Sequence, residues 1–175
     1  MSSKSAYLLT TMVIGCLLVP KTAAADLFVV PWMGGNAGGS NGSSLVDLGA
    51  SVGATAAGVV DIDVDLGYSP DYFEGGSRSY VLTMMSDVTF GIPFGRHDAP
   101  RLRPYVLGGF GLIRSRFESG SASYRIGHDD WGAALGGGFT LWAAARVGVR
   151  ADLRHVQTLP ERLQYWRASV GVVIR

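Results

Sequence analysis

The chain has 175 residues, enough for one domain, and its composition is 47% hydrophobic with 25 glycines. Its only lysines, Lys4 and Lys21, lie near the N-terminus, so residues 26–175 carry 13 Arg against 14 Asp plus Glu, a net charge near −1. This balance gives no electrostatic basis for a nucleic-acid partner, and three scattered histidines with one cysteine argue against a metal or other cofactor.

Residues 1–25 have the organisation of a secretory signal peptide. Lys4 precedes an apolar stretch from Ala6 to Pro20, and Ala23-Ala24-Ala25 come directly before Asp26. A charged start, an apolar middle and an Ala-x-Ala end are the three parts of such a peptide. We therefore predict a cleaved signal peptide at residues 1–25 and a mature domain at residues 26–175.

Two alternatives to a cleaved signal peptide are open. An uncleaved anchor helix would need about 20 apolar residues, and the stretch is shorter and interrupted by Thr and Gly. A lipoprotein signal is suggested by Val13-Ile14-Gly15-Cys16. Lipoproteins usually continue with polar residues, however, and Leu17-Leu18-Val19 follow here.

After Asp26 the hydrophobic pattern has a period of two, which predicts strands and no helices. Eight segments of this kind follow in chain order: about 27–33, 46–52, 59–68, 80–90, 101–117, 131–141, 146–156 and 163–174. Most are near the 9–11 residues with which a tilted strand crosses a bilayer. The fifth segment is apolar on both faces, so its orientation is not fixed by pattern.

Three of these segments define the expected polarity of the sheet. Residues 59–68 place Val60, Ile62, Val64, Leu66 and Tyr68 on one face and Asp61, Asp63, Asp65 and Gly67 on the other. Residues 131–141 alternate larger apolar residues with a face of Gly, Ala and Thr. Residues 146–156 alternate apolar residues with Arg146, Arg150 and Arg154. Such alternation is typical of a membrane barrel with lipid outside and a polar interior.

The connections alternate between long and short. Residues 34–44, 69–77, 118–128 and 157–162 are polar or rich in Gly and Ser, whereas residues 55–58 and 142–145 suit tight turns. Long loops on one side and short turns on the other characterise outer-membrane barrels, with the long loops outside the cell. Residues 93–100 are the exception, being long for a turn on the inner side.

These patterns predict an all-β fold: an eight-stranded antiparallel up-and-down transmembrane β-barrel. Backbone groups cannot stay unpaired in hydrocarbon, so the sheet must close, and eight strands leave a narrow interior filled by side chains. The third and seventh strands lie opposite each other in such a ring. We expect a lumen charge network of Asp61, Asp63, Asp65, Arg146, Arg150 and Arg154, because Arg binds carboxylates well and unpaired buried charge is costly.

Aromatic residues near the strand ends suggest two belts at the headgroup level. The expected outer belt contains Trp32, Tyr68, Tyr80, Trp131 and Trp166, and the expected inner belt contains Phe28, Phe90, Tyr105, Phe139 and Trp142.

The segment from Ile92-Pro93-Phe94-Gly95 through Arg103-Pro104-Tyr105 to the Gly-rich strand resembles the small outer-membrane β-barrels of the OmpA-like transmembrane-domain type. The resemblance implies a bacterial outer-membrane location, a narrow or plugged lumen and a non-enzymatic role in envelope structure or surface contact. It also implies outer-membrane lipid and the barrel-insertion machinery as partners of a monomer. The chain departs from that pattern by ending in Val173-Ile174-Arg175, where many such barrels end in an aromatic residue.

Two other functions are alternatives. A lipid A-modifying enzyme, deacylase or acyltransferase-like, could use His128 or His155 with Asp129, Asp130 or Glu161. The deacylases carry His-x-Ser, however, whereas this chain has His155-Val156-Gln157, and no nucleophile–base pair is evident from spacing. A soluble lipocalin-like binding barrel would turn its apolar faces inward around a ligand.

Overall fold

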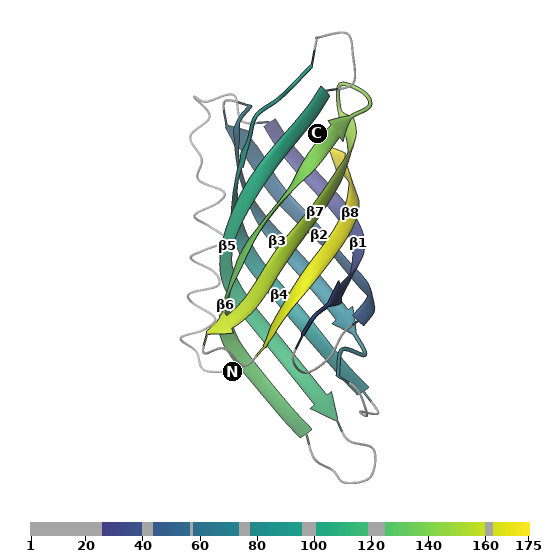
Figure 1. Ribbon diagram of the computed structural model, residues 1–175, viewed down its shortest axis with the longest axis vertical. Coiled ribbons are helices and arrows are strands. Elements are labelled where there is room, and N and C mark those ends of the chain that lie inside the picture. The colour runs from purple at the N-terminus through teal and green to yellow at the C-terminus, as the bar shows by residue number, and fades with distance from the viewer. Residues whose placement is uncertain are drawn as a thin grey trace.

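A computed structural model describes residues 26–39, 44–56, 58–73, 78–95, 101–118, 125–159 and 163–175. The eight strands are β1 (Asp26–Ala37), β2 (Ser44–Ala56), β3 (Val60–Pro70), β4 (Arg78–Gly91), β5 (Arg101–Glu118), β6 (Arg125–Trp142), β7 (Val147–Leu159) and β8 (Gln164–Ile174). Consecutive strands pair antiparallel, and β8 pairs with β1 to close the ring (Figure 1). The predicted eight-stranded antiparallel up-and-down barrel is confirmed. The predicted signal peptide lies outside the described residues.

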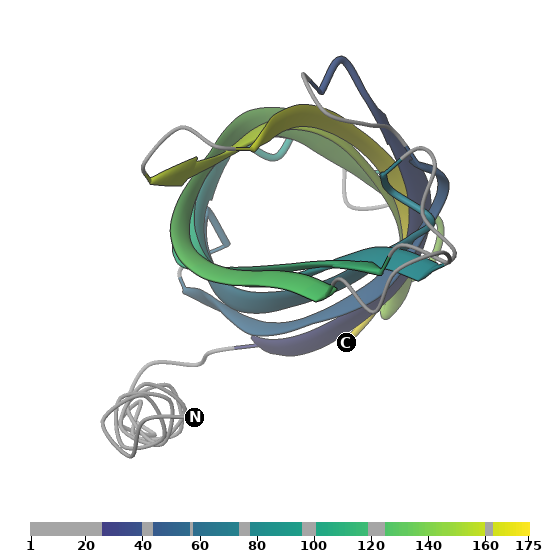
Figure 2. The same cartoon turned by 90° about the horizontal axis from the view of Figure 1, so that it is seen from below.

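Viewed along its axis the sheet forms one continuous wall (Figure 2). Every strand therefore has a hydrogen-bonded neighbour on both sides, and the barrel has no long open edge of the kind that invites aggregation. The described part of the chain contains no helix of sufficient length and apolarity to cross a membrane.

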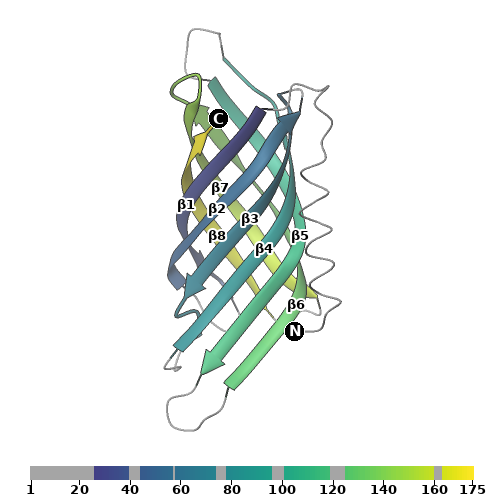
Figure 3. The same ribbon diagram turned by 180° about the vertical axis from the view of Figure 1, so that it is seen from behind.

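The two ends of the barrel differ. We call one end the terminal end, because it holds the start of β1 and the end of β8. The connections β2–β3, β4–β5 and β6–β7 also lie there. At the loop end lie the other four connections, and β5 and β6, of 18 residues each, project beyond their neighbours there (Figure 3). β6 pairs with β7 only from Trp131 onward, so residues 125–130 belong to this projection.

The outer surface of the wall is apolar. Exposed large hydrophobic side chains occur on all eight strands and include Leu66, Phe90, Val106, Leu135, Val149 and Val170. Leu135 is 73% exposed and Val106 62% exposed. Residues 59–68 show the predicted alternation with the same polarity. Ile62 and Leu66 face outward, and the aspartates between and beside them are buried.

The fifth strand, whose facing the pattern left open, is oriented by its arginine. Arg103, Tyr105, Leu107 and Ile113 are buried inside the barrel, and Leu102, Val106 and Phe110 are exposed. A shift of one residue in the register would exchange the two faces of the strand and move Arg103 from the lumen to the apolar outer face. Arg103 pairs with the buried Asp61 of β3, and this buried charge favours the observed facing of β5.

The predicted aromatic belts are wrong at four positions, one of which is Trp142, which packs inside the barrel against Phe28 and Val173. Phe28, Trp32 and Tyr105 are each less than 9% exposed and point into the barrel, not toward its outer surface. β1 and β5 carry apolar residues on both faces, so the alternation could not show which face is inside. Of the remaining belt residues, Tyr68, Phe90, Trp131, Phe139 and Trp166 are exposed on the outer wall, and Trp131 stacks on Phe110.

Small residues on the inner face of β6 make room for long side chains from other strands. A Cβ added at Gly136 would meet the backbone of Leu153 and Arg154, and one added at Gly138 would meet the backbone of Ala151 and lie 2.8 Å from the Tyr105 hydroxyl. A Cβ added at Gly132 would likewise meet the side chain of Ile113. The glycine face noted in the sequence is therefore a packing surface for the lumen.

Candidate functional site in the barrel lumen

The lumen contains a connected group of buried charges. Of the predicted network, the structure places Asp61, Asp63, Asp65, Arg150 and Arg154 inside the barrel, each no more than 5% exposed. Contacts cross the lumen from β3 to β7: Arg154 Nη1 lies 3.7 Å from Asp65 Oδ1, and Arg150 Nη1 lies 3.9 Å from Asp63 Oδ2. These separations are longer than a hydrogen bond.

The shortest ion pairs of Arg154 involve carboxylates outside the predicted rows. Its Nη1 donates to Asp87 Oδ2 on β4 at 2.7 Å, and its Nε donates to Asp152 Oδ1 at 3.0 Å. Asp87 is completely buried and Arg154 is 2% exposed. One guanidinium therefore links three acidic side chains, on β3, β4 and β7.

Asp65 is the second centre of the network. Its carboxylate accepts hydrogen bonds from Arg167 Nη2 at 2.6 Å, from Ser51 Oγ at 2.8 Å and from Trp32 Nε1 at 2.9 Å. The guanidinium of Arg167 also lies over the Trp32 ring, 4.2 Å from its centre. The indole thus supports an ion pair, which explains why Trp32 points inward.

Arg146 differs from the prediction. It lies in the turn before β7, which begins at Val147, and its side chain is exposed. Its backbone carbonyl accepts the N–H of Arg175. β7 begins one residue later than the alternation predicts, so Arg146 lies outside the lumen.

Sequence reasoning missed several buried charged residues of the lumen, namely Asp47, Asp87, Arg103 and Arg167. A signal for them existed: each sits between two outward-facing residues of its strand, as Arg167 does between Trp166 and Ala168. Asp152 lies on the same inward-facing row of β7 as Arg150 and Arg154 and pairs with Arg154. The acidic and basic rows are therefore distributed over six strands.

An apolar cluster fills the lumen at the loop end. It consists of Tyr72, Val81, Met85, Ile113, Ala134, Val156, Leu163 and Tyr165, with Phe73 packed against it. Tyr72 comes from the β3–β4 connection and is fully buried, with its ring 5.5 Å from that of Tyr165. Burial raises the pKa of the Tyr72 phenol to about 12. We call this group the loop-end plug.

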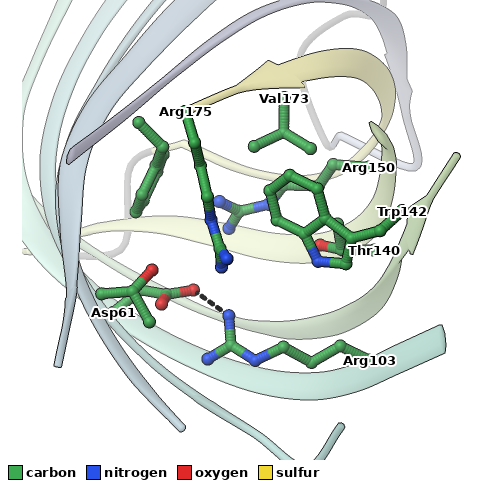
Figure 4. A pocket seen from close by; sticks show the side chains of 9 residues that line it. Asp61, Arg103, Thr140, Trp142, Arg150, Val173 and Arg175 are labelled. Atoms are coloured by element: carbon green, nitrogen blue, oxygen red, sulfur yellow. Dashed lines mark hydrogen bonds and ion pairs between the residues drawn. The ribbon is translucent and has the colours of Figure 1, made fainter. Parts of the chain in front are cut away.

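The terminal end of the lumen is different, because a small recess is open there. It is lined by Phe28, Thr55, Asp61, Arg103, Thr140, Trp142, Arg150, Val173 and Arg175 (Figure 4). Arg103 Nη1 donates to Asp61 Oδ2 at 2.6 Å. The guanidinium of Arg175 lies 4.0 Å from the centre of the Trp142 ring. The lumen therefore has three layers: a basic recess, a layer of ion pairs and an apolar plug.

The candidate rim residues do not form one site. His155 packs against the Trp166 ring, with centroids 5.1 Å apart. Leu135 is the β6 partner of His155, so His128 lies seven residues further along β6, roughly 23 Å away at the rise of a strand. Glu161 lies outside the described residues.

Asp129 on the β5–β6 projection forms an ion pair with Arg114. Arg114 Nε and Nη2 donate to its two carboxylate oxygens at 2.6 and 2.9 Å. These hydrogen bonds lower the pKa of Asp129. Among the described residues, no group of three or more His, Cys, Asp or Glu side chains is arranged to hold a metal ion.

Solved structures show where this architecture occurs. The chain is similar to Neisserial surface protein A, with a TM-score of 0.67, 15% identity and coverage of 86% of this chain and 98% of that one. It is also similar to the N-terminal β-barrel domain of Pseudomonas aeruginosa OprF, with a TM-score of 0.59, 18% identity and coverage of 86% and 98%.

A third similar structure is a major outer membrane protein from Thermus thermophilus, with a TM-score of 0.51, 13% identity and coverage of 86% and 99%. No protein-family model matches the sequence, and no curated protein matches it significantly. At these identities the similarity concerns the fold, which is that of the small outer-membrane β-barrels. The predicted resemblance to that type of fold is confirmed.

Proposed function

We propose that this chain is an integral outer-membrane β-barrel without enzymatic activity, with a structural or surface-contact role in the cell envelope. The observation that carries the proposal is the inverted polarity of the barrel. Large apolar side chains cover the outside, while Asp65, Asp87 and Arg154 are buried inside. A soluble protein rarely exposes so large an apolar surface, and a lipocalin-like barrel would need the opposite arrangement.

The height of the apolar surface supports the same proposal. On β6 it runs from Trp131 to Leu141, both exposed on the outer wall. Ten residue steps at the rise of a strand, tilted by about 40°, span about 25 Å, the usual height of the apolar band of outer-membrane barrels. Exposed aromatic residues lie at both ends of this span: Trp131 and Trp166 toward the loop end, and Phe90 and Phe139 toward the terminal end.

In this proposal the loop end faces outside the cell and the terminal end faces the periplasm. The loop-end plug and the ion pairs then close the barrel as a through-channel. The partners are outer-membrane lipid along the wall and the barrel-insertion machinery during assembly, and the barrel acts as a monomer. Export depends on a cleaved signal peptide at residues 1–25.

Fractionation of cells is the direct test. The protein should be recovered in the outer-membrane fraction and should migrate differently on a gel before and after heating. Recovery as a soluble periplasmic protein would contradict the proposal.

A pair of matched variants tests the membrane band itself. Leu135→Arg places a charge at the middle of the band and should cost about 2–4 kcal/mol of stability in lipid, whereas Leu45→Arg, at the loop-end start of β2, should cost about 0–1 kcal/mol. Both leucines are exposed, at 73% and 93%. Urea titration in lipid vesicles measures the difference. Equal costs at the two positions would argue against a bilayer around the barrel.

The absence of enzymatic activity is tested separately. Lipid A mass spectra from cells with and without the gene should be identical. A change in acyl chains that depends on the gene would favour the lipid A-modifying alternative.

A further inference from the structure

The recess at the terminal end of the lumen gathers hydrogen-bond donors that have no acceptor. Within the described residues, Arg103 Nε and Nη2, Arg150 Nη2 and Arg175 Nε lack a hydrogen-bond partner, as does the Thr55 hydroxyl. Arg103 is 4% exposed and Arg150 is 5% exposed. Figure 4 shows the three arginine side chains pointing into the same space. Four residues, which between them carry five such atoms, therefore line one small volume.

The charge of the lining favours a negative ligand. Arg103, Arg150 and Arg175 supply three positive side-chain charges, and Asp61 has the one side-chain carboxylate among the lining residues. Arg150 and Arg175 approach other carboxylates only at 3.8–3.9 Å, beyond hydrogen-bond distance. Buried donors without an acceptor are costly, and guanidinium groups bind oxyanions with strong, directional hydrogen bonds. An oxyanion would accept hydrogen bonds from these donors and would offset the positive charge of the arginines.

Asp61 narrows the choice among oxyanions. Its Oδ2 accepts from Arg103, but its Oδ1 is buried without a partner among the described residues. A bare oxyanion would be repelled by this oxygen. A phosphate group is protonated in part near neutral pH, so its O–H can donate to Asp61 Oδ1 while its other oxygens accept from the arginines. Sulfate has no such proton to offer.

We propose that the terminal-end recess is a binding site for the phosphate group of a small soluble molecule. The lining side chains point into the lumen and not onto the outer wall, so the ligand enters from the aqueous terminal end. In the membrane orientation proposed above, this end opens to the periplasm. The site is independent of any role of the outer surface.

Arg175 closes the recess. The free space beneath the side chains is about that of one water molecule, so a phosphate group enters only when a side chain moves. Arg175 is the residue best able to move: its side chain is 24% exposed, and its ion pair with Asp26 is 3.8 Å long. Arg103 and Arg150, by contrast, are fixed by burial. Arg175 swings out from Trp142 and then closes over the bound anion.

Calorimetric titration of the folded barrel tests the site. The protein is refolded in a maltoside detergent, which contains no phosphate, and titrated at neutral pH with inorganic phosphate and, in a separate experiment, with sulfate. We expect saturable binding of one phosphate per chain, at least about tenfold tighter than sulfate. No saturable phosphate binding, or equal binding of the two anions, would overturn the proposal.

Variants locate the binding and separate it from folding. Arg103→Gln should weaken phosphate binding at least about tenfold, and Thr55→Val, which keeps the side-chain shape, should weaken it a few-fold. Arg114→Gln, on the β5–β6 projection, is the control and should bind like the unmodified chain. Heat-modifiable migration shows that each variant is folded. Wild-type affinity in a folded Thr55→Val or Arg103→Gln barrel would reject this location.

The same titration distinguishes the source of the phosphate group. Glycerol phosphate should compete with inorganic phosphate, whereas phosphatidic acid in mixed micelles should not, because its headgroup stays at the outer wall. Competition by the lipid would overturn the assignment to a soluble ligand. Asp61→Asn should reduce the preference for phosphate over sulfate, and an unchanged preference would contradict the role given to Asp61.

Discussion

Arg154 offers the most informative test of the lumen, because it links three carboxylates at once. It lies 2.7 Å from Asp87, 3.0 Å from Asp152 and 3.7 Å from Asp65, and it is 2% exposed. Arg154→Met keeps most of the side-chain volume and removes the charge. Asp87, which has its shortest ion pair with Arg154, then remains as a buried carboxylate without that partner.

The expected cost follows from this geometry. Removing one partner of a buried ion pair costs about 3–5 kcal/mol, since the remaining charge is left uncompensated. The matched control is Arg114→Met, which breaks an ion pair of similar length with Asp129 on an exposed surface. Exposed pairs contribute about 0–1 kcal/mol. The two variants should therefore differ by at least about 2 kcal/mol in the free energy of unfolding.

A double variant isolates the interaction from general disturbance of the lumen. Arg154→Met with Asp87→Asn removes both charges, so the combined cost should be less than the sum of the single costs by about 1 kcal/mol or more. The unmodified chain, the two single variants and the double variant are unfolded with urea in lipid vesicles. Gel migration and Trp fluorescence measure the free energy of unfolding of each. Equal costs for Arg154→Met and Arg114→Met, or strictly additive single costs, would refute the reasoning.

Two further predictions concern packing and pH. Gly109→Ala should destabilise the barrel by about 1–3 kcal/mol, because the added Cβ would press on Asp87. The control is the adjacent Gly108→Ala, whose Cβ meets nothing within 4 Å and which should be nearly neutral. Equal unfolding midpoints for the two variants would contradict this prediction. Tyr72 has a folded pKa of about 12 against an ordinary 10.0, so the loop-end plug should be fully stable below pH 10 and lose stability as the pH rises toward 12. Tyrosinate absorbance of the folded barrel against Tyr72→Phe measures this, and ionisation of Tyr72 near its ordinary pKa would show that the ring is not buried.

Prediction from the sequence succeeded where one face of a strand was clearly polar. Residues 59–68 alternate apolar residues with aspartates, and the pattern fixed both the strand and its polarity. It failed where both faces were apolar. The aromatic belts place Phe28 and Trp32 at the outer surface because they lie near strand ends, but both side chains face the lumen. β1 has hydrophobic residues on each side, and alternation then carries no information about which side faces the lumen.

The ion pairs illustrate a second limit. The aspartates of β3 and the arginines of β7 were recognised as opposed rows, since opposite strands in an eight-stranded ring follow from chain order. Their shortest partners, Asp87 for Arg154 and Arg167 for Asp65, come from other strands. Side-chain length and the tilt of the strands decide which charges meet, and neither can be read from one strand at a time.

The sequence by itself determined the number of strands, their order and the alternation of apolar and polar faces, because these follow from a period of two and from turn chemistry. The tertiary structure alone decided how the lumen is divided into a basic recess, a layer of ion pairs and an apolar plug. That division depends on the stagger between strands, which sets the height of each inward side chain along the barrel axis. It brought Arg103, Arg150 and Arg175, separated by up to 72 residues in sequence, around one recess.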